Sequence, residues 1–108
     1  MKFNILIIPP FGKQLIKLSK KYPSLKTEFA GLINSLELNP MQGTFIGHHC
    51  YKIRLSIHSK NRGKRGGARV ITHIVISETI VYLLTIYDKS EKDDLSNKEL
   101  LELLSKLQ

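Results

Sequence analysis

The alternating segment Tyr51-Lys-Ile-Arg-Leu-Ser-Ile-His58 decides the fold. Its apolar residues take every second position, and successive side chains of a β-strand point to opposite faces of a sheet. We therefore predict a half-buried strand here, with Lys52, Arg54 and His58 on the face that points away from the core.

The residues before this strand predict one strand and two helices. The run Phe3–Ile8 is short and apolar and stops at Pro9-Pro10, as a first strand would. Apolar residues then recur at helical spacing from Phe11 to Tyr22 and from Leu25 to Leu36. Pro23 separates the two helices, and Ser24 is expected to cap the second.

The residues around and after the strand complete an α+β pattern. Gly43–Gly47 and residues 59–67 are interpreted as loops, while Ala68–Ile76 and Thr79–Tyr87 are β-branched runs that predict a hairpin. Ser96-Asn-Lys-Glu99 is a capping box that opens a last helix. We predict a single domain, 1–108, with the order β-α-α-β-β-β-α. Its largely antiparallel four-stranded sheet would have helices packed on one face.

Charge is the clearest functional signal. The chain has 108 residues and a formal net charge of +8, from 17 Lys and Arg against 9 Asp and Glu. Residues 38–77 contain no acid, yet they hold seven basic residues, namely Lys52, Arg54, Lys60, Arg62, Lys64, Arg65 and Arg69. Such a cluster repels itself, so we infer that it binds an external polyanion, most simply nucleic acid.

Other features exclude several functional classes. The single cysteine, Cys50, cannot form an intramolecular disulfide and fits a reducing compartment. It could be a nucleophile paired with His48 or His49, although a buried apolar role is the favoured interpretation. No apolar run approaches the ~20 residues of a membrane span, so we expect a cytoplasmic protein without membrane contact. No metal-ligand cluster or phosphate loop is visible, and we expect neither a metal nor another cofactor.

Three segments together resemble one family of proteins. They are Tyr51–Leu55, Gly63-Lys-Arg-Gly-Gly-Ala-Arg-Val70 and Leu84-Thr-Ile-Tyr-Asp-Lys-Ser-Glu-Lys92, in that order after two helices. The chain resembles the RelE/HigB bacterial toxins of type II toxin–antitoxin systems, and the last of these segments, followed by Asp93-Asp-Leu-Ser96, looks most like the HigB branch with the long basic loop. The resemblance implies the RelE fold and an endoribonuclease that cuts mRNA in the ribosomal A site, beside ribosomal RNA. In such enzymes the 2′-hydroxyl attacks the adjacent phosphate without a metal, and a cognate helix-turn-helix antitoxin neutralises the toxin.

The resemblance also implies a set of catalytic residues. Lys52 and Arg54 match basic residues of the second strand of the family, Arg69 matches the arginine that contacts the scissile phosphate, and Lys89 matches a basic residue after the last strand. Two positions depart from the family. Ser90 stands where an arginine follows the lysine, and the place of a base-stacking tyrosine falls near Ser96.

The chemistry of these side chains limits their roles. Arginine has a pKa above ~12 and is a poor base, so Arg54 and Arg69 are better suited to clamp the phosphorane. A lysine or a histidine could act as the base, and the sequence leaves that choice open. For contacts to RNA we predict six further residues, Lys60, Arg62, Lys64, Arg65, His58 and His73.

Two alternative functions remain open at this stage. The chain could be a non-catalytic module that binds RNA or the ribosome through the same basic face, or a degenerate toxin retained as an antitoxin partner. Tyr87 is expected to lie in the core, although its position near Lys89 makes it a candidate for base stacking. The acidic run at 91–94 could shield the basic face.

Overall fold

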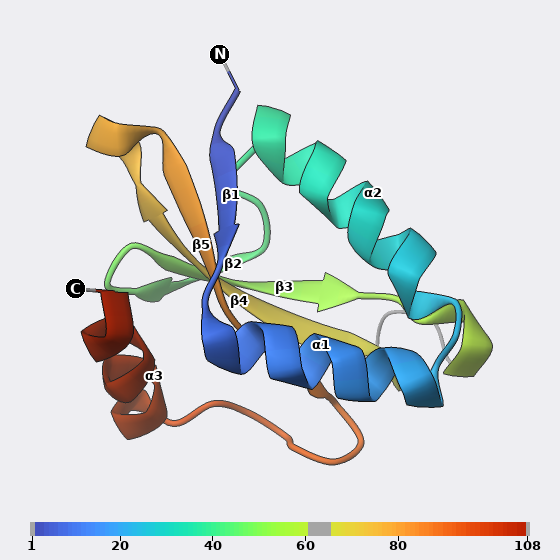
Figure 1. The fold of residues 1–108 in the computed structure, drawn as a ribbon. Helices are drawn as coiled ribbons and strands as arrows, with labels where there is room; N and C mark the ends of the chain where they lie inside the picture. Colours follow the sequence, from blue (N-terminus) through green and yellow to red (C-terminus); the bar gives the residue numbers. More distant parts are fainter. Residues whose placement is uncertain (1, 61–65, 108) are drawn as a thin grey trace.

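A twisted five-stranded sheet forms the centre of the molecule in the computed structural model, which describes residues 2–60 and 66–107 (Figure 1). The strands are β1 (Asn4–Ile7), β2 (Thr44–Gly47), β3 (Cys50–Leu55), β4 (Ala68–Val75) and β5 (Ile80–Asp88). The helices are α1 (Pro9–Lys21), α2 (Leu25–Leu38) and α3 (Asn97–Leu104), with short 3-10 turns at His58–Lys60, Ile76–Glu78 and Ser105–Leu107. The predicted α+β class is confirmed.

The strand order in the sheet is β1-β5-β4-β3-β2. Strand β1 runs parallel to β5, and the other neighbours are antiparallel. The helices α1 and α2 are inserted between β1 and the antiparallel part of the sheet, which allows the first strand to pair with the last one. None of the helices in the described part of the chain is long and apolar enough to cross a membrane.

The sheet has one strand more than the sequence predicted. Residues 44–47, which we interpreted as a loop, form β2 and pair with β3. The turn between these strands is made by His48 and His49, with φ angles of 53° and 58°. Tight hairpin turns with positive φ usually show glycine or asparagine in the sequence, so two histidines did not signal this one.

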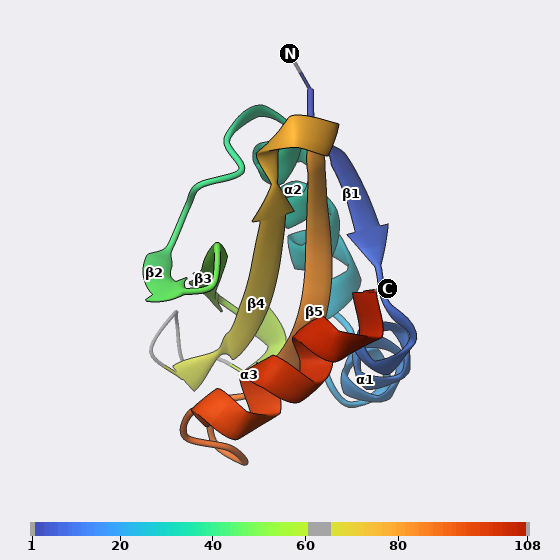
Figure 2. The ribbon, with the colours of Figure 1, turned by 90° about the vertical axis from the view of Figure 1, so that its left-hand side faces the viewer.

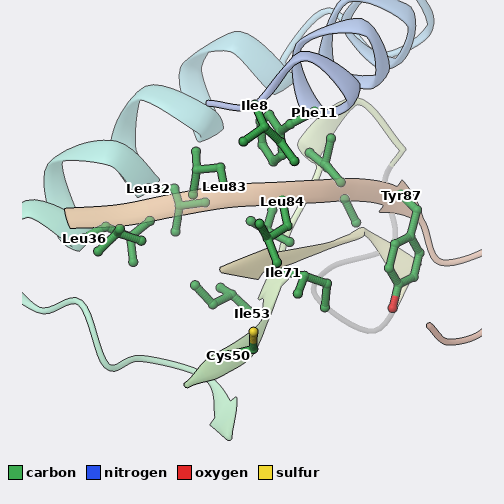
Figure 3. Packing of buried hydrophobic residues seen from close by; sticks show 14 of the residues in the cluster. Ile8, Phe11, Leu32, Leu36, Cys50, Ile53, Ile71, Leu83, Leu84 and Tyr87 are labelled. Atoms are coloured by element: carbon green, nitrogen blue, oxygen red, sulfur yellow. The ribbon is translucent and has the colours of Figure 1, made fainter. Parts of the chain in front are cut away.

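Helices α1 and α2 cover one face of the sheet, which we call the α1/α2 face. Buried residues of both helices, among them Phe11, Leu32 and Leu36, lie on the same side of β5 as Leu83 (Figure 3). Pro9 and Pro10 do not end the strand with a break, because they occupy the first turn of α1. That position needs no backbone N–H donor, so proline fits it.

Helix α3 lies on the opposite face, which we call the α3 face. Figure 2 shows α3 in front of β4 and β5, with α1 and α2 behind the sheet. The prediction that all helices share one face is therefore wrong for α3. Fully buried Ile71 of β4 explains this, because its side chain shares the α3 face with Arg69 and needs an apolar cover, which Leu95 and Leu100 help to supply.

Of the two predicted helix caps, the structure shows the one at α3 but not the one at α2. The capping box at the start of α3 is confirmed, because the Glu99 backbone N–H donates to Ser96 Oγ at 3.1 Å and the Ser96 N–H donates to Glu99 Oε1 at 2.9 Å. Ser24 does not cap α2 through its side chain. Its hydroxyl bonds to the Glu28 carboxylate at 3.1 Å and accepts from the Ser59 backbone N–H at 2.9 Å, which ties the turn at His58–Lys60 to α2.

Candidate nucleic-acid interface

Two arginines and a tyrosine form a row across three adjacent strands on the α3 face. In the strand register, Arg54 of β3 lies opposite Arg69 of β4, and Arg69 lies opposite Tyr87 of β5. Side chains that face each other in this way have Cβ atoms about 4.5–5.5 Å apart. We call these three residues the arginine row.

Arg69 is the centre of the row and is only 5% exposed. Its Nη1 donates to the Ala68 carbonyl oxygen at 3.1 Å. Burial lowers the pKa of the Arg69 guanidinium, and the like charge of Arg54 lowers it further, while Tyr87 acts in the opposite direction. An arginine remains charged under such shifts, so the row concentrates two positive charges at a partly desolvated place. An anion bound there would relieve their repulsion.

Lys52 and Lys89 flank the row, and each contacts an aspartate from the segment that leads into α3. Lys52 Nζ lies 3.3 Å from Asp94 Oδ1, and Lys89 Nζ lies 2.7 Å from Asp93 Oδ1 and 2.6 Å from the Asp93 carbonyl oxygen. We call residues 91–94 the acidic strap. The Lys89 contact lowers the pKa of Asp93, while the pKa of Asp94 is lowered first by the Leu95 backbone N–H and then by Lys52. The strap therefore neutralises both lysines, as the sequence suggested.

A cavity of about 240 Å³ lies beside Lys52, where the strap meets α3. Its walls combine apolar side chains of the sheet with the end of the strap and the first residues of α3, namely Ile46, Lys52, Ile71, Asp94, Leu95, Ser96, Asn97 and Leu100. The cavity places Lys52 at an accessible edge of the α3 face.

Tyr87 is buried, as expected, but its hydroxyl group is not hydrogen-bonded to any of the described residues. The residue is 7% exposed. Burial raises the pKa of Tyr87 to about 12, helped by the negative charges of Asp94, Glu99 and Asp93 and opposed by Arg69. The hydroxyl is therefore protonated at neutral pH.

Lys60 has a different role from the predicted contact to RNA. Its ammonium forms a buried ion pair with Asp88, donates to Ser90 Oγ at 3.3 Å and lies 5.3 Å from the centre of the Tyr22 ring. Burial alone would raise the pKa of Asp88, but hydrogen bonds from Lys60, Ser90 and Tyr22 hold it well below its usual range. The structure thus corrects the assignment of Lys60, whose charge is used inside the fold.

His58 is also placed away from the arginine row. Strand β3 ends at Leu55, so the alternation that would align residue 58 with Arg54 stops before it. The His58 Nδ1 atom lies 2.7 Å from the Glu28 carboxylate, and its backbone N–H donates to the same oxygen at 2.6 Å. His58 therefore contacts α2, not the α3 face.

His73 shares the face of Arg69 but lies four residues further along β4, about 13 Å away at the usual rise of a strand. Its Nδ1 donates to the His48 carbonyl oxygen at 2.9 Å and lies 3.5 Å from Cys50 Sγ. Burial lowers the pKa of His73. Burial also raises the pKa of the Cys50 thiol to about 12, which argues against a nucleophile and supports the apolar role.

Two further points concern the basic loop and metal binding. Arg62, Lys64 and Arg65 lie outside the described residues. Among the residues that the structure describes, no group of His, Cys, Asp and Glu side chains is arranged to hold a metal ion.

Comparison with solved structures identifies the fold. No protein-family model matches the sequence. A double arginine-to-alanine variant of the E. coli toxin RelE, in the free state, aligns over 100% of both chains with a TM-score of 0.66 and 14% sequence identity. The chain has the RelE fold. The toxin–antitoxin complex RelBE2 of Mycobacterium tuberculosis also matches, with a TM-score of 0.56 and 16% identity over 82% of this chain and 92% of that chain.

The two departures from the RelE/HigB pattern have structural roles in this RelE fold. Ser90 donates to Asp88 Oδ1 from its backbone N–H at 3.0 Å and from its hydroxyl at 2.7 Å. Ser96 caps α3. Neither side chain takes part in the arginine row. Sequence reasoning linked Lys52, Arg54 and Arg69 by strand parity, but it placed Tyr87 mainly in the core and did not anticipate Asp88 as the partner of Lys60.

Proposed function

We propose that this protein is a ribosome-dependent mRNA endoribonuclease, the toxin of a type II toxin–antitoxin pair. The observation that carries the proposal is the arginine row, in which Arg54 and Arg69 face each other beside Tyr87. The RelE fold supports it, because the similar structures include the E. coli toxin RelE and a toxin–antitoxin complex.

The arginine row suits attack by a ribose 2′-hydroxyl on the neighbouring phosphate. The phosphorane that forms carries more negative charge than the starting phosphate, and two guanidinium groups can each contact it through two parallel N–H donors. Lys52 and Lys89 stand at the edge of the row and would add positive charge once the strap aspartates release them.

The row itself contains no carboxylate pair for acid–base catalysis. We therefore assign much of the rate to orientation of the message by the ribosome. Correct alignment of an intramolecular attack can contribute ~7–11 kcal/mol to catalysis. On this proposal the protein cleaves naked RNA only feebly.

The proposed partner that controls the toxin is a cognate antitoxin of the helix-turn-helix class, as the resemblance implies. A toxin with a net charge of +8 favours an acidic partner segment. Two experiments would test the proposed antitoxin. The protein should copurify with the product of a neighbouring small gene, and adding that product to the free toxin should abolish cleavage.

The test of the activity is primer extension on a defined message in a purified translation system, with and without ribosomes. We expect cuts inside codons only when ribosomes are present. In Arg69→Ala the rate of cleavage should fall by about 10²–10³-fold, the effect of losing one donor that stabilises the transition state. Lys13→Ala is the matched control, because it removes one exposed positive charge from α1. Equal cleavage by wild type and Arg69→Ala would refute the proposed site.

A second candidate is a non-catalytic module that binds RNA or the ribosome, or a degenerate toxin that only binds its antitoxin. The structural roles of Ser90 and Ser96 favour it, since both positions carry functional residues in the resembling family and serve Asp88 and α3 here. RNA binding without any cuts in the presence of ribosomes would select this candidate.

A further inference from the structure

We propose that Tyr87 is the general acid of this endoribonuclease, a role that rests on the function proposed above. Its hydroxyl would give a proton to the 5′ oxygen that leaves when the RNA chain is cut. The row otherwise consists of two arginines, whose charge is suited to hold the phosphate, so Tyr87 is the remaining proton donor of the row.

The position of Tyr87 suits this role. It lies opposite Arg69 in the register of β4 and β5, so a phosphate held by Arg69 would be next to the tyrosine ring. Figure 3 shows the ring on the side of β5 away from Phe11, with the hydroxyl pointing away from α1 and α2. The side chain therefore belongs to the α3 face, where Arg54 and Arg69 also lie.

No hydrogen bond to the described residues explains why a hydroxyl is present at this position. The group is buried without a hydrogen-bond partner among the described residues. Such a group costs about 1–3 kcal/mol, and folded proteins leave few of them. A phenylalanine would fill the same space without that cost. The other such oxygen in the described residues, Thr72 Oγ1, lies on the α1/α2 face by strand parity and has no route to the arginine row.

The cover over Tyr87 is built from contacts that an RNA can displace. A cavity of about 250 Å³ is bordered by Tyr87 together with Lys92 of the strap, Leu95 that follows the strap and Glu99 of α3. Lys92 and Glu99 form a partly exposed ion pair at 2.6 Å. Phosphates that bind Lys52 and Lys89 would compete directly with the strap aspartates, and displacement of the strap would uncover the hydroxyl.

The proton balance of the step is complete. The 2′ oxygen bonds to phosphorus and loses its proton to water, while the bond from phosphorus to the 5′ oxygen breaks. The Tyr87 proton passes to that oxygen, and the tyrosinate, held beside the Arg69 guanidinium, regains a proton from water. The acidic neighbours raise the pKa of Tyr87 and Arg69 lowers it, so departure of the strap would make the hydroxyl a stronger acid.

The first test is Tyr87→Phe, assayed for thermal stability and for cleavage on ribosomes. We expect an unchanged or higher Tm, because the lost oxygen has no partner, and cleavage that is lower by 10²–10⁴-fold, the usual contribution of a general acid. Tyr82→Phe is the matched control, since Tyr82 lies on the same strand and the same face, opposite His73 and away from the arginines.

A message with sulfur in place of the 5′ bridging oxygen gives the decisive readout. Sulfur leaves without protonation, so Tyr87→Phe should cleave that message at nearly the wild-type rate. Equal slowing on the oxygen and sulfur messages would overturn the acid role, even for a variant with a lowered Tm. If wild type cuts ribosomal message and Tyr87→Phe cuts it equally well, this inference alone fails. If wild type does not cut at all, the proposed function fails with it.

Discussion

The two faces of the sheet use positive charge in opposite ways. On the α1/α2 face, the ammonium of Lys60 is buried against the carboxylate of Asp88, with Tyr22 and Ser90 completing the hydrogen bonds. On the α3 face, Arg54 and Arg69 lie opposite each other, and burial and mutual repulsion both act on Arg69. Residues from one basic stretch of sequence thus serve the fold on one face and create a site for an anion on the other.

The difference lies in where the negative charge comes from. Asp88 is at the end of β5 and is fixed within the sheet, so its pair with Lys60 is part of the folded structure. Asp93 and Asp94 are in the strap, and their side chains are 96% and 65% exposed. Exposed ion pairs contribute little to stability and give way to competing ions. The ion pairs that neutralise Lys52 and Lys89 on the α3 face can therefore be displaced by another anion.

Lys60→Ala should have the largest effect on stability. It leaves the Asp88 carboxylate buried without its counter-ion, which typically costs about 3–5 kcal/mol of unfolding free energy. Urea denaturation followed by circular dichroism would measure the loss. The double variant Lys60→Met/Asp88→Leu should recover much of it, because both charges are then absent. A loss below about 1 kcal/mol for Lys60→Ala would mean that the pair is not buried as described.

Acid should weaken the α1/α2 face through Asp88. The folded-state pKa of Asp88 is depressed below the ordinary value of about 3.9, so the unfolded state binds the proton more readily. This contribution to stability is fully present above the unfolded pKa and is lost as the pH falls through the folded one. Urea midpoints from pH 6 down to pH 2 should decline, and the decline should be shallower in Asp88→Asn. Equal slopes in the two proteins would contradict the assignment.

Removal of the strap charges should strengthen RNA binding on the α3 face. In Asp93→Asn/Asp94→Asn, Lys52 and Lys89 lose their carboxylate partners, so we expect a several-fold gain in affinity for a single-stranded RNA oligomer, largest at low salt. Fluorescence anisotropy would measure it. Glu37→Gln/Glu78→Gln changes the net charge equally, on α2 and in the turn before β5, away from the row, and is the control. Equal gains in both would show that only net charge matters.

Arg54→Ala should have the smallest effect on stability and the opposite sign to Lys60→Ala. Like charges that face each other across two strands destabilise a sheet, so their removal should raise the unfolding free energy by a few tenths of a kcal/mol. The same variant should cleave ribosomal message less well than wild type. A substantial loss of stability would show that Arg54 is needed for folding, which would weaken the contrast between the two faces.

Local patterns predicted much of this fold. The alternation around Lys52 and Arg54 placed both on one face with Arg69, and the capping box at Ser96 marked the start of α3. These features depend on residues a few positions apart. The strand β2 was missed because its turn uses histidines with positive φ, a conformation that a sequence usually signals through glycine, asparagine or aspartate.

The sequence by itself determined the α+β class, the basic character of the chain and the parity that joins Arg54 to Arg69. Only the tertiary structure decided which charged side chains form ion pairs inside the fold and which lie on the α3 face. Lys60 and Asp88 are 28 positions apart, Lys52 and Asp94 are 42 apart, and Tyr87 meets Arg69 only through the register of β4 and β5. Periodicity is a local property of a chain, whereas the partner of a charge and the isolation of a hydroxyl depend on which distant segments pack together.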